Sequence, residues 1–132
     1  MGRDREGAGR RREHDRRRLT VTASRGEVWL VDFGEPIGRE QAGRRPAVIL
    51  SADGLNHGPA GIVIVVPCIT ARRDLPSHVE LDPALTGLAA ISYAKCEDVR
   101  SISTERLVTR VGAAGPQAIF AIERAVRFLL EL

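Results

Sequence analysis

A continuous run of β-branched residues, Ile62-Val-Ile-Val-Val-Pro67, places the strongest constraint on the fold of this chain. Successive side chains of a strand point to opposite faces, so a strand that is apolar at every position must be covered on both sides. The run therefore predicts a strand buried in the middle of the molecule. Pro67 has no backbone N–H, and we expect it to mark the end of this strand, at a sheet edge or a bulge.

Shorter β-patterned segments lie on both sides of this run. Residues 26–33 alternate, with Val28 and Leu30 on one face and Trp29, Val31 and Phe33 on the other. Turn residues and apolar alternation predict further strands over 47–51, 78–81 and 105–111. Residues 89–94 and 97–100 are predicted to form two short strands or one bent strand. Turns are predicted over 82–87 and 101–104, a flexible break over 112–115, and one helical turn after Ser51.

The C-terminal segment is the one clear helix in the sequence, predicted over 116–132. Pro116 suits the first helical turn. Apolar residues then recur at three- and four-residue steps, at Ile119, Ile122, Val126, Leu129 and Leu130. Short strands closed by a single helix predict a mainly β fold, in the form of a small β-barrel or curled sheet with the helix packed across it.

The basic charge of the chain is concentrated near its N-terminus. Residues 1–18 hold eight Arg and four acidic residues, whereas the remainder holds twelve Lys or Arg and thirteen acidic residues. Residues 1–24 contain too few apolar side chains to fold alone, so we expect a disordered basic tail at 1–24 and one domain at 25–132. The folded part is near neutral, and the high overall pI does not by itself indicate binding of nucleic acid.

The composition favours a cytoplasmic protein without a metal or a cofactor. No apolar run reaches 18 residues, so no membrane span is expected, and Cys68 and Cys96 are typical of reduced, buried thiols. His14, His57 and His78 lack partners at the spacing of metal ligands. The chain also has no phosphate-binding P-loop and no GxSxG nucleophile motif.

A cation and a hydroxyl remain as candidates for chemistry. Pro46 pushes Arg45 toward an extended conformation at the entrance of the strand predicted over 47–51. Thr70 lies just after the strand predicted over 62–67. A guanidinium fork and a hydroxyl donor at the ends of two strands can bind one phosphodiester. The alternatives are a basic surface turn for Arg45 and an ordinary strand position for Thr70.

From Arg25 onward the chain resembles the MazF/PemK/Kid family of toxin endoribonucleases. The resemblance rests on RGEVWLVDFG (25–34), GREQAGRRPAVIL (38–50), VVPCITARRDLPSHVEL (65–81) and EDVRSISTERL (97–107). It implies a small SH3-like β-barrel with a C-terminal helix, a homodimer, and cleavage of single-stranded RNA without a metal or another cofactor. It also implies Arg45 and Thr70 as the catalytic residues of a reaction in which the ribose 2′-OH attacks the adjacent phosphorus, leaving a cyclic phosphate and a 5′-hydroxyl.

Further candidate residues lie close to Arg45 and Thr70 in the sequence. Glu40, the carboxylate nearest Arg45 in the sequence, is a candidate general base or a partner that orients Arg45. The remaining candidates for binding RNA are Gln41, Arg44, Arg39 and Arg72. Residues 90–92, Ala-Ile-Ser, replace a charged segment of the Arg-Asp-Ser type found in relatives, which bears on the RNA sequence that is preferred.

The resemblance also implies a partner, an antitoxin whose acidic and partly disordered segment folds onto the RNA-binding groove. Two alternatives remain open from the sequence. One is a protein-binding inhibitor on the same fold, like the gyrase-poisoning CcdB relatives, which needs neither Arg45 nor Thr70. The other is an inactive RNA binder.

Overall fold

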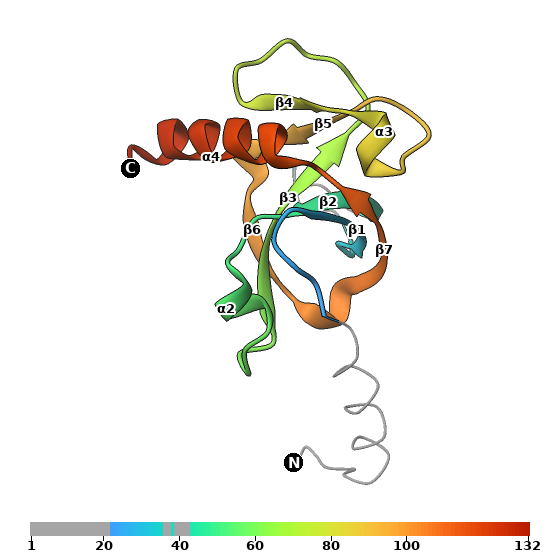
Figure 1. The fold of residues 1–132 in the computed structure, drawn as a ribbon, viewed down its shortest axis with the longest axis vertical. Coiled ribbons are helices and arrows are strands. Elements are labelled where there is room, and N and C mark those ends of the chain that lie inside the picture. Colours follow the sequence, from blue (N-terminus) through green and yellow to red (C-terminus); the bar gives the residue numbers. More distant parts are fainter. Residues whose placement is uncertain (1–21, 36–37, 39–42) are drawn as a thin grey trace, which may run out of the picture.

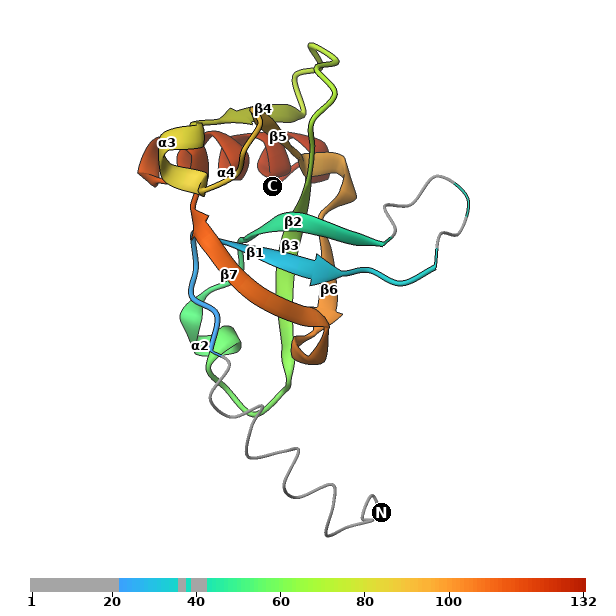
Figure 2. The same ribbon diagram turned by 90° about the vertical axis from the view of Figure 1, so that its right-hand side faces the viewer.

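The fold is organised around one long central strand, as the β-branched run predicts. The computed structural model describes residues 22–35, 38 and 43–132 (Figures 1 and 2). The tail predicted over 1–24 therefore lies outside the described residues except for its last three, and residues 39–42 lie outside them as well. The strands are β1 (Glu27–Asp32), β2 (Arg44–Ile49), β3 (Ile62–Ile69), β4 (His78–Leu81), β5 (Ser92–Lys95), β6 (Arg100–Ser103) and β7 (Leu107–Ala113).

The helices are short except for the last. They are α2 (Asp53–Asn56), α3 (Pro83–Thr86), the 3-10 turns η1 (Cys96–Asp98) and η2 (Thr104–Arg106), and α4 (Pro116–Leu130). Figure 1 shows α4 lying beside β4 and β5 at one end of the molecule, whereas α2 lies at the other end. Among the described residues, no helix is long and apolar enough to cross a membrane.

The sheet is antiparallel, with the order β4-β5-β3-β2-β1-β7, and β6 is paired to β3. The fold class is confirmed as mainly β with a C-terminal helix. Within the described residues, however, β7 pairs with β1 alone, so the curved sheet is not closed into a hydrogen-bonded barrel.

Two apolar clusters cover the two faces of the sheet. One fills the concave side and includes Trp29, Val31, Ala47, Ile49 and Val65. The other lies under α4 and is formed by Val28, Val48, Val66, Cys68, Leu81, Ala94, Cys96, Ala114 and Ile122. The predicted alternation in β1 is confirmed, because Val28 belongs to the helix-covered cluster while Trp29 and Val31 face the concave one.

Pro67 does not end its strand. It is fully buried in β3 and lies across from Ala47 of β2. On the other side of β3, pairing with β6 stops at Val65 and pairing with β5 starts at Cys68. Pro67 therefore occupies the position where β3 exchanges one neighbour for another, and its missing N–H costs no ladder hydrogen bond there.

Other boundaries also differ from the predictions. The turn predicted over 101–104 is mostly strand β6, because Ile102 is buried against the concave cluster. The predicted turn over 82–87 contains α3, which Asp82 caps by accepting a hydrogen bond from the Ala84 N–H at 2.9 Å. The break predicted at 112 falls later, since β7 runs to Ala113. The helix ends at Leu130, and Leu129 and Leu130 are exposed rather than buried.

Gly112 shows why β7 and α3 pack so closely. A Cβ atom at this position would lie 2.2 Å from the backbone oxygen of Thr86. Contacts that short are not tolerated, so a residue without a side chain is required where the two elements meet.

Candidate active site

Two glycines determine where β2, the strand that carries Arg45, begins. Gly34 and Gly43 have φ values of 80° and 72°, which a side chain would strain. The Phe33 N–H donates to the Gly43 carbonyl at 2.9 Å, and the Gly43 N–H donates to the Gly34 carbonyl at 2.8 Å. These bonds set the start of β2 at Arg44, three residues earlier than predicted, so Arg45 lies within the strand.

The antiparallel pairing of β2 and β3 brings Arg45 and Thr70 to the same end of the sheet. The observed pairing of β2 with β3 reaches Ala47 across from Pro67, so the start of β2, with Arg45, and the end of β3 lie at the same end of the sheet. Thr70 follows Ile69 directly, where β3 ends. Both Arg45 and Thr70 are exposed. Among the described residues no hydrogen-bond partner is seen for the Thr70 hydroxyl, so this group is open to a ligand.

Two further cations predicted from the sequence lie at this end. Arg44 is exposed and lies across from Asp32 of β1. Arg72 is also exposed, and its Nε lies 2.8 Å from Asp74 Oδ1, which raises the pKa of the guanidinium. The predicted residues Arg39, Glu40 and Gln41 lie outside the described residues.

The structure adds two arginines that the sequence reasoning missed. The Arg100 guanidinium lies 5.4 Å from the centre of the Phe33 ring, just past the end of β1. Arg106 Nη1 donates to the Asp32 carbonyl at 3.1 Å. Both residues therefore reach the end of β1 that leads toward β2, and with Arg44 and Arg45 they form what we call the basic rim. Both arginines belong to the segment EDVRSISTERL. The apolar alternation in that segment is too short to predict which way their side chains point.

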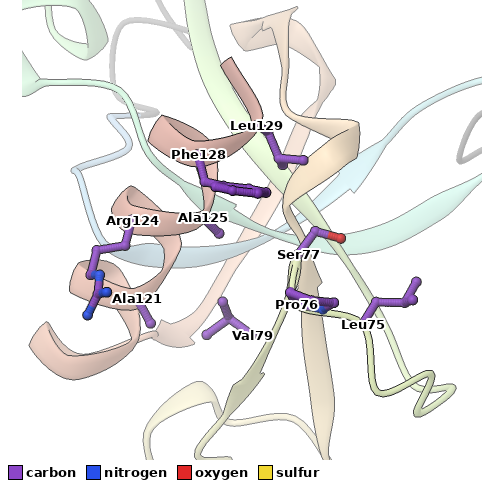
Figure 3. Close-up of a pocket in the computed structure, with 9 residues that line it drawn as sticks. All are labelled: Leu75, Pro76, Ser77, Val79, Ala121, Arg124, Ala125, Phe128 and Leu129. Atoms are coloured by element: carbon purple, nitrogen blue, oxygen red, sulfur yellow. The ribbon is translucent and has the colours of Figure 1, made fainter. Parts of the chain in front are cut away.

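An apolar groove lies elsewhere, between α4 and the segment that leads into β4 (Figure 3). Its volume is about 540 Å³, and its walls include Leu75, Pro76, Phe128 and Leu129. None of the predicted phosphate-binding residues among those described lines it. The groove is therefore separate from the candidate site.

A polar cluster ties the start of β4 to η1. Ser77 Oγ donates to Glu97 Oε1 at 2.7 Å, and His78 Nε2 lies 3.0 Å from Glu97 Oε2. Burial raises the pKa of Glu97, but the hydrogen bonds from Ser77 and His78, a backbone hydrogen bond and the nearby His78 charge together leave the pKa below its usual value. His78 is almost completely buried, and its Nδ1 has no partner within the described part of the chain. These hydrogen bonds fix the C-terminal end of the segment that runs from Thr70 to the start of β4.

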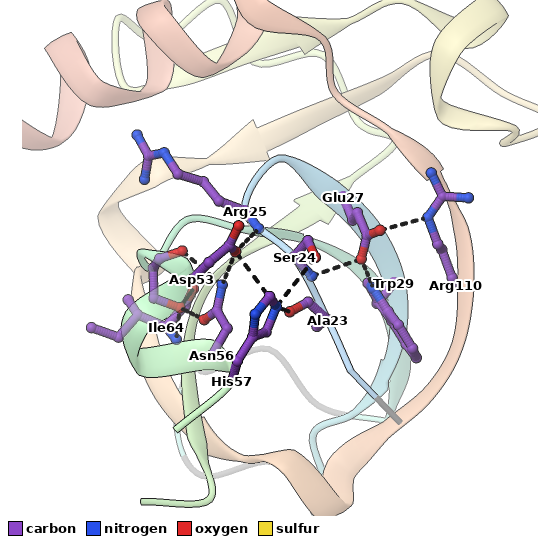
Figure 4. A network of polar contacts seen from close by, with 11 residues as sticks. Ala23, Ser24, Arg25, Glu27, Trp29, Asp53, Asn56, His57, Ile64 and Arg110 are labelled. Atoms are coloured by element: carbon purple, nitrogen blue, oxygen red, sulfur yellow. Dashed lines mark hydrogen bonds and ion pairs between the residues drawn. The ribbon is translucent and has the colours of Figure 1, made fainter. Parts of the chain in front are cut away.

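A second network lies at the opposite end of β1, β2 and β3 (Figure 4). Glu27 accepts hydrogen bonds from the Ser24 N–H at 2.8 Å and from Trp29 Nε1 at 2.9 Å, and it pairs with Arg110 at 3.0 Å. Asp53 accepts from the Arg25 N–H at 2.7 Å. These bonds hold the first described residues against the sheet and α2, and they leave little capacity for a ligand. In residues 22–35, 38 and 43–132, no three His, Cys, Asp or Glu side chains come together as metal ligands would.

The comparisons with known proteins identify the family of the chain. The family model described as PemK-like, MazF-like toxin of type II toxin–antitoxin system matches residues 24–130. The chain is 34% identical to endoribonuclease MazF9 of Mycobacterium tuberculosis, over 82% of this chain and 96% of that protein. It is 33% identical to endoribonuclease toxin MazF of Escherichia coli K12, over 80% of this chain and 91% of that protein.

Solved structures support the fold. MazF from Deinococcus radiodurans superposes with a TM-score of 0.74 at 24% identity, covering 84% of this chain and 98% of that one. A mycobacterial endoribonuclease in complex with its cognate antitoxin gives a TM-score of 0.69, also at 24% identity, with coverages of 83% and 96%. The match to the family model spans most of the chain and the relatives are matched over nearly their whole length, so the protein belongs to the PemK-like, MazF-like toxin family of type II toxin–antitoxin systems.

Proposed function

We propose that this toxin is an endoribonuclease that cleaves single-stranded RNA at specific sequences without a metal ion. The observation that carries the proposal is that Arg45, in β2, and Thr70, directly after β3, are exposed at the same end of two paired strands. Support also comes from the relatives, which are named endoribonucleases. RNA supplies its own nucleophile, so the protein needs to bind and stabilise one phosphodiester.

In the proposed reaction the ribose 2′-oxygen attacks the adjacent phosphorus and the bond from phosphorus to the 5′-oxygen breaks. The products are a 2′,3′-cyclic phosphate and a 5′-hydroxyl. Negative charge builds on the non-bridging oxygens in the transition state, where the Arg45 guanidinium is a two-pronged donor and Thr70 supplies a further hydrogen bond. Arginine does not release a proton near neutral pH, so a different group must accept the proton of the 2′-OH.

Glu40 is the proposed acceptor of that proton, or else the carboxylate that orients Arg45. The two roles differ in pH dependence. A Glu40→Gln variant that has lost a general base loses the acidic limb of the pH–rate profile, because that limb reports the ionisation of the base. A variant that has lost an orienting partner keeps the shape of the profile at a lower rate.

The basic rim is proposed to hold the flanking phosphates. Arg44, Arg100 and Arg106 lie at the same end of the sheet as the proposed scissile phosphate, and Arg39 and Gln41 shortly precede Arg44 in the sequence. Phosphate contacts of this kind release counterions, so binding of RNA should weaken steeply with salt. The same positive rim suits an antitoxin with an acidic segment.

A homodimer is part of the proposal. The end of α4 exposes a cluster of large apolar side chains, with Phe128 and Leu132 each 80% exposed and Leu130 56% exposed. Such a patch is typical of a contact surface between proteins. A second copy on this patch would bury it. Sedimentation of the wild type and of Phe128→Asp tests this, since the variant should sediment as a monomer if the patch is the dimer contact.

The activity is tested with purified protein in excess EDTA and an end-labelled RNA of mixed sequence, beside the same sequence made of DNA. Cleavage of RNA alone, with cyclic-phosphate ends, supports the proposal, because DNA lacks the attacking hydroxyl. Cleavage of DNA, a requirement for added metal, or failure to cut any RNA by a folded protein contradicts it.

A further inference from the structure

Tyr93 is the one aromatic residue of this chain that lies neither in the concave cluster nor in α4. Of the other aromatic residues, Trp29 and Phe33 are buried in the concave cluster, and Phe120 and Phe128 belong to α4. Tyr93 lies in β5, where its neighbours Ser92 and Ala94 are buried and Ala94 packs under α4. Alternation along the strand therefore directs Tyr93 to the sheet face opposite α4, where it is partly exposed.

The position of Tyr93 in the sheet is next to the proposed phosphate site. Tyr93 lies directly across from Ile69 of β3, the residue that precedes Thr70. On its other side it lies directly across from Glu80 of β4, which is exposed. Side chains directly across an antiparallel pair are about 5 Å apart at Cβ, so Ile69, Tyr93 and Glu80 form one row across three strands.

Arg72 lies close to this row in the chain, two residues after Thr70, and is exposed. Its Nε lies 2.8 Å from Asp74 Oδ1, and Asp74 is the main cause of the raised pKa of its guanidinium. An aromatic ring and a carboxylate thus share one row of the sheet beside Thr70, and a cation follows Thr70 in the chain. Single-stranded RNA is recognised with these groups: a ring for base stacking, a cation for phosphate, and polar atoms for the base edge.

We infer that Tyr93, Arg72 and Glu80 bind the nucleotide next to the cleaved phosphate and set which base is accepted there. The inference rests on the proposed ribonuclease function. The Tyr93 ring stacks on the base, Glu80 accepts hydrogen bonds from N–H groups on the base edge, and Arg72 binds the neighbouring phosphate. Tyr93 is a specificity residue in this account, and the reaction itself remains with Arg45 and Thr70.

The test compares Tyr93→Phe, which keeps a ring, with Tyr93→Val, which removes the ring but keeps a residue suited to a strand. Phe120→Ala is the matched control, because it removes an exposed aromatic ring from α4, away from this face. Thermal unfolding of each variant verifies that it is folded. Binding is measured by fluorescence anisotropy with an oligonucleotide that carries a single 2′-deoxyribose at the cleavage position, and cleavage is measured on an RNA pool with every base at each flanking position.

We expect Tyr93→Val to weaken binding and raise KM by about 5- to 100-fold, the range typical of a lost base stack, with kcat changed by less than about 3-fold. The base preference at one flanking position should flatten, whereas Tyr93→Phe and Phe120→Ala should behave like the wild type. If the wild type cleaves RNA and folded Tyr93→Val keeps its affinity and base preference, the inference is overturned while the proposed function stands. If the wild type neither binds nor cleaves RNA, the proposed function fails, and the inference fails with it.

Discussion

The two ends of the three strands β1, β2 and β3 use polar residues in opposite ways. At the end near α2, Ser51 and Asn56 are buried and bonded to each other, and Ser51 Oγ accepts a hydrogen bond from the Ile64 N–H at 2.9 Å. At the other end, Arg44 and Thr70 are exposed. We call the end with the internally bonded network the closed end, and the end with the exposed Arg44 and Thr70 the open end.

This difference separates polar groups that stabilise the fold from polar groups that remain available for binding. Buried polar groups without partners are costly, so a network inside the fold must be fully bonded, as the one around Asn56 and Glu27 is. Exposed cations carry no such cost and contribute little to folding. Substitutions at the closed end should therefore change stability, and substitutions at the open end should change cleavage of RNA.

The largest expected effect is at the open end. Replacing Thr70 with Ala should lower the single-turnover rate of RNA cleavage by about 100- to 1000-fold, the usual loss when one donor to a transition-state oxyanion is removed. The free energy of unfolding should change by less than about 0.5 kcal/mol, because the side chain is exposed. Thr109→Ala, at an exposed position in β7, makes the same chemical change as a control. A Thr70→Ala variant that cuts RNA at the wild-type rate contradicts the assignment.

The next largest effect is expected at the closed end. Glu27→Ala leaves the indole N–H of buried Trp29 and the Ser24 N–H without their acceptor. The free energy of unfolding in urea should fall by about 1–3 kcal/mol, while the cleavage rate of the folded protein stays unchanged. Glu131→Ala, at the exposed end of α4, serves as the control. A large loss of cleavage rate in folded Glu27→Ala would show that the two ends are not independent.

Lowering the pH should reduce the stability of the protein through Asp53, which lies at the closed end. The Arg25 backbone N–H, and after it the Asn56 side chain, lower the pKa of this carboxyl below its ordinary value. A lowered pKa in the folded state stabilises the protein above the pKa of the unfolded chain, and this contribution is lost as pH falls through the folded-state pKa. The wild type should therefore be more stable than Asp53→Asn at pH 7, and the difference should shrink toward pH 3. Urea unfolding of both proteins across this range measures it, and a constant difference contradicts the prediction.

The smallest effect is expected from the thiols. Burial raises the pKa of both Cys68 and Cys96 to about 12. Cys68 is close to Thr70 in sequence but packs under α4, so it should take no part in the reaction. A thiol reagent at pH 8 should label neither cysteine until urea unfolds the protein, and treatment should not alter cleavage. Rapid labelling of the native protein would show that the helix-covered face opens more readily than its burial indicates.

The sequence predicted the parts of the fold that depend on local pattern. The β-branched run at 62–67 became β3, Pro116 began α4, and the residue pattern HVEL became β4. The errors have tertiary causes. Pro67 sits inside a strand because β6 and β5 divide the neighbouring edge between them, and Leu129 and Leu130 are exposed because the last turn of α4 extends beyond its packing surface. Such pairings depend on distant segments, which periodicity does not reveal.

The candidate site stays a prediction. Arg45, Thr70, Arg44 and Arg72 follow from their positions at strand ends and from the resemblance, and all four residues are exposed in the structure. The sequence pattern did not indicate Arg100, Arg106 and Tyr93 as further candidates. Their contribution depends on which strand lies beside which, since Tyr93 becomes a neighbour of Ile69 only when β5 pairs with β3.

The most direct test of the account is the rate of RNA cleavage by Arg45→Ala and Arg45→Lys in EDTA, with the unfolding midpoint of each protein measured in parallel. We expect Arg45→Ala to lose at least about 100-fold in single-turnover rate, and Arg45→Lys to recover only part of it, because an ammonium lacks the planar fork of a guanidinium. Both variants should unfold at the wild-type midpoint. Cleavage at the wild-type rate by folded Arg45→Ala, with cyclic-phosphate ends, would contradict the claim that the open end of these strands is the active site.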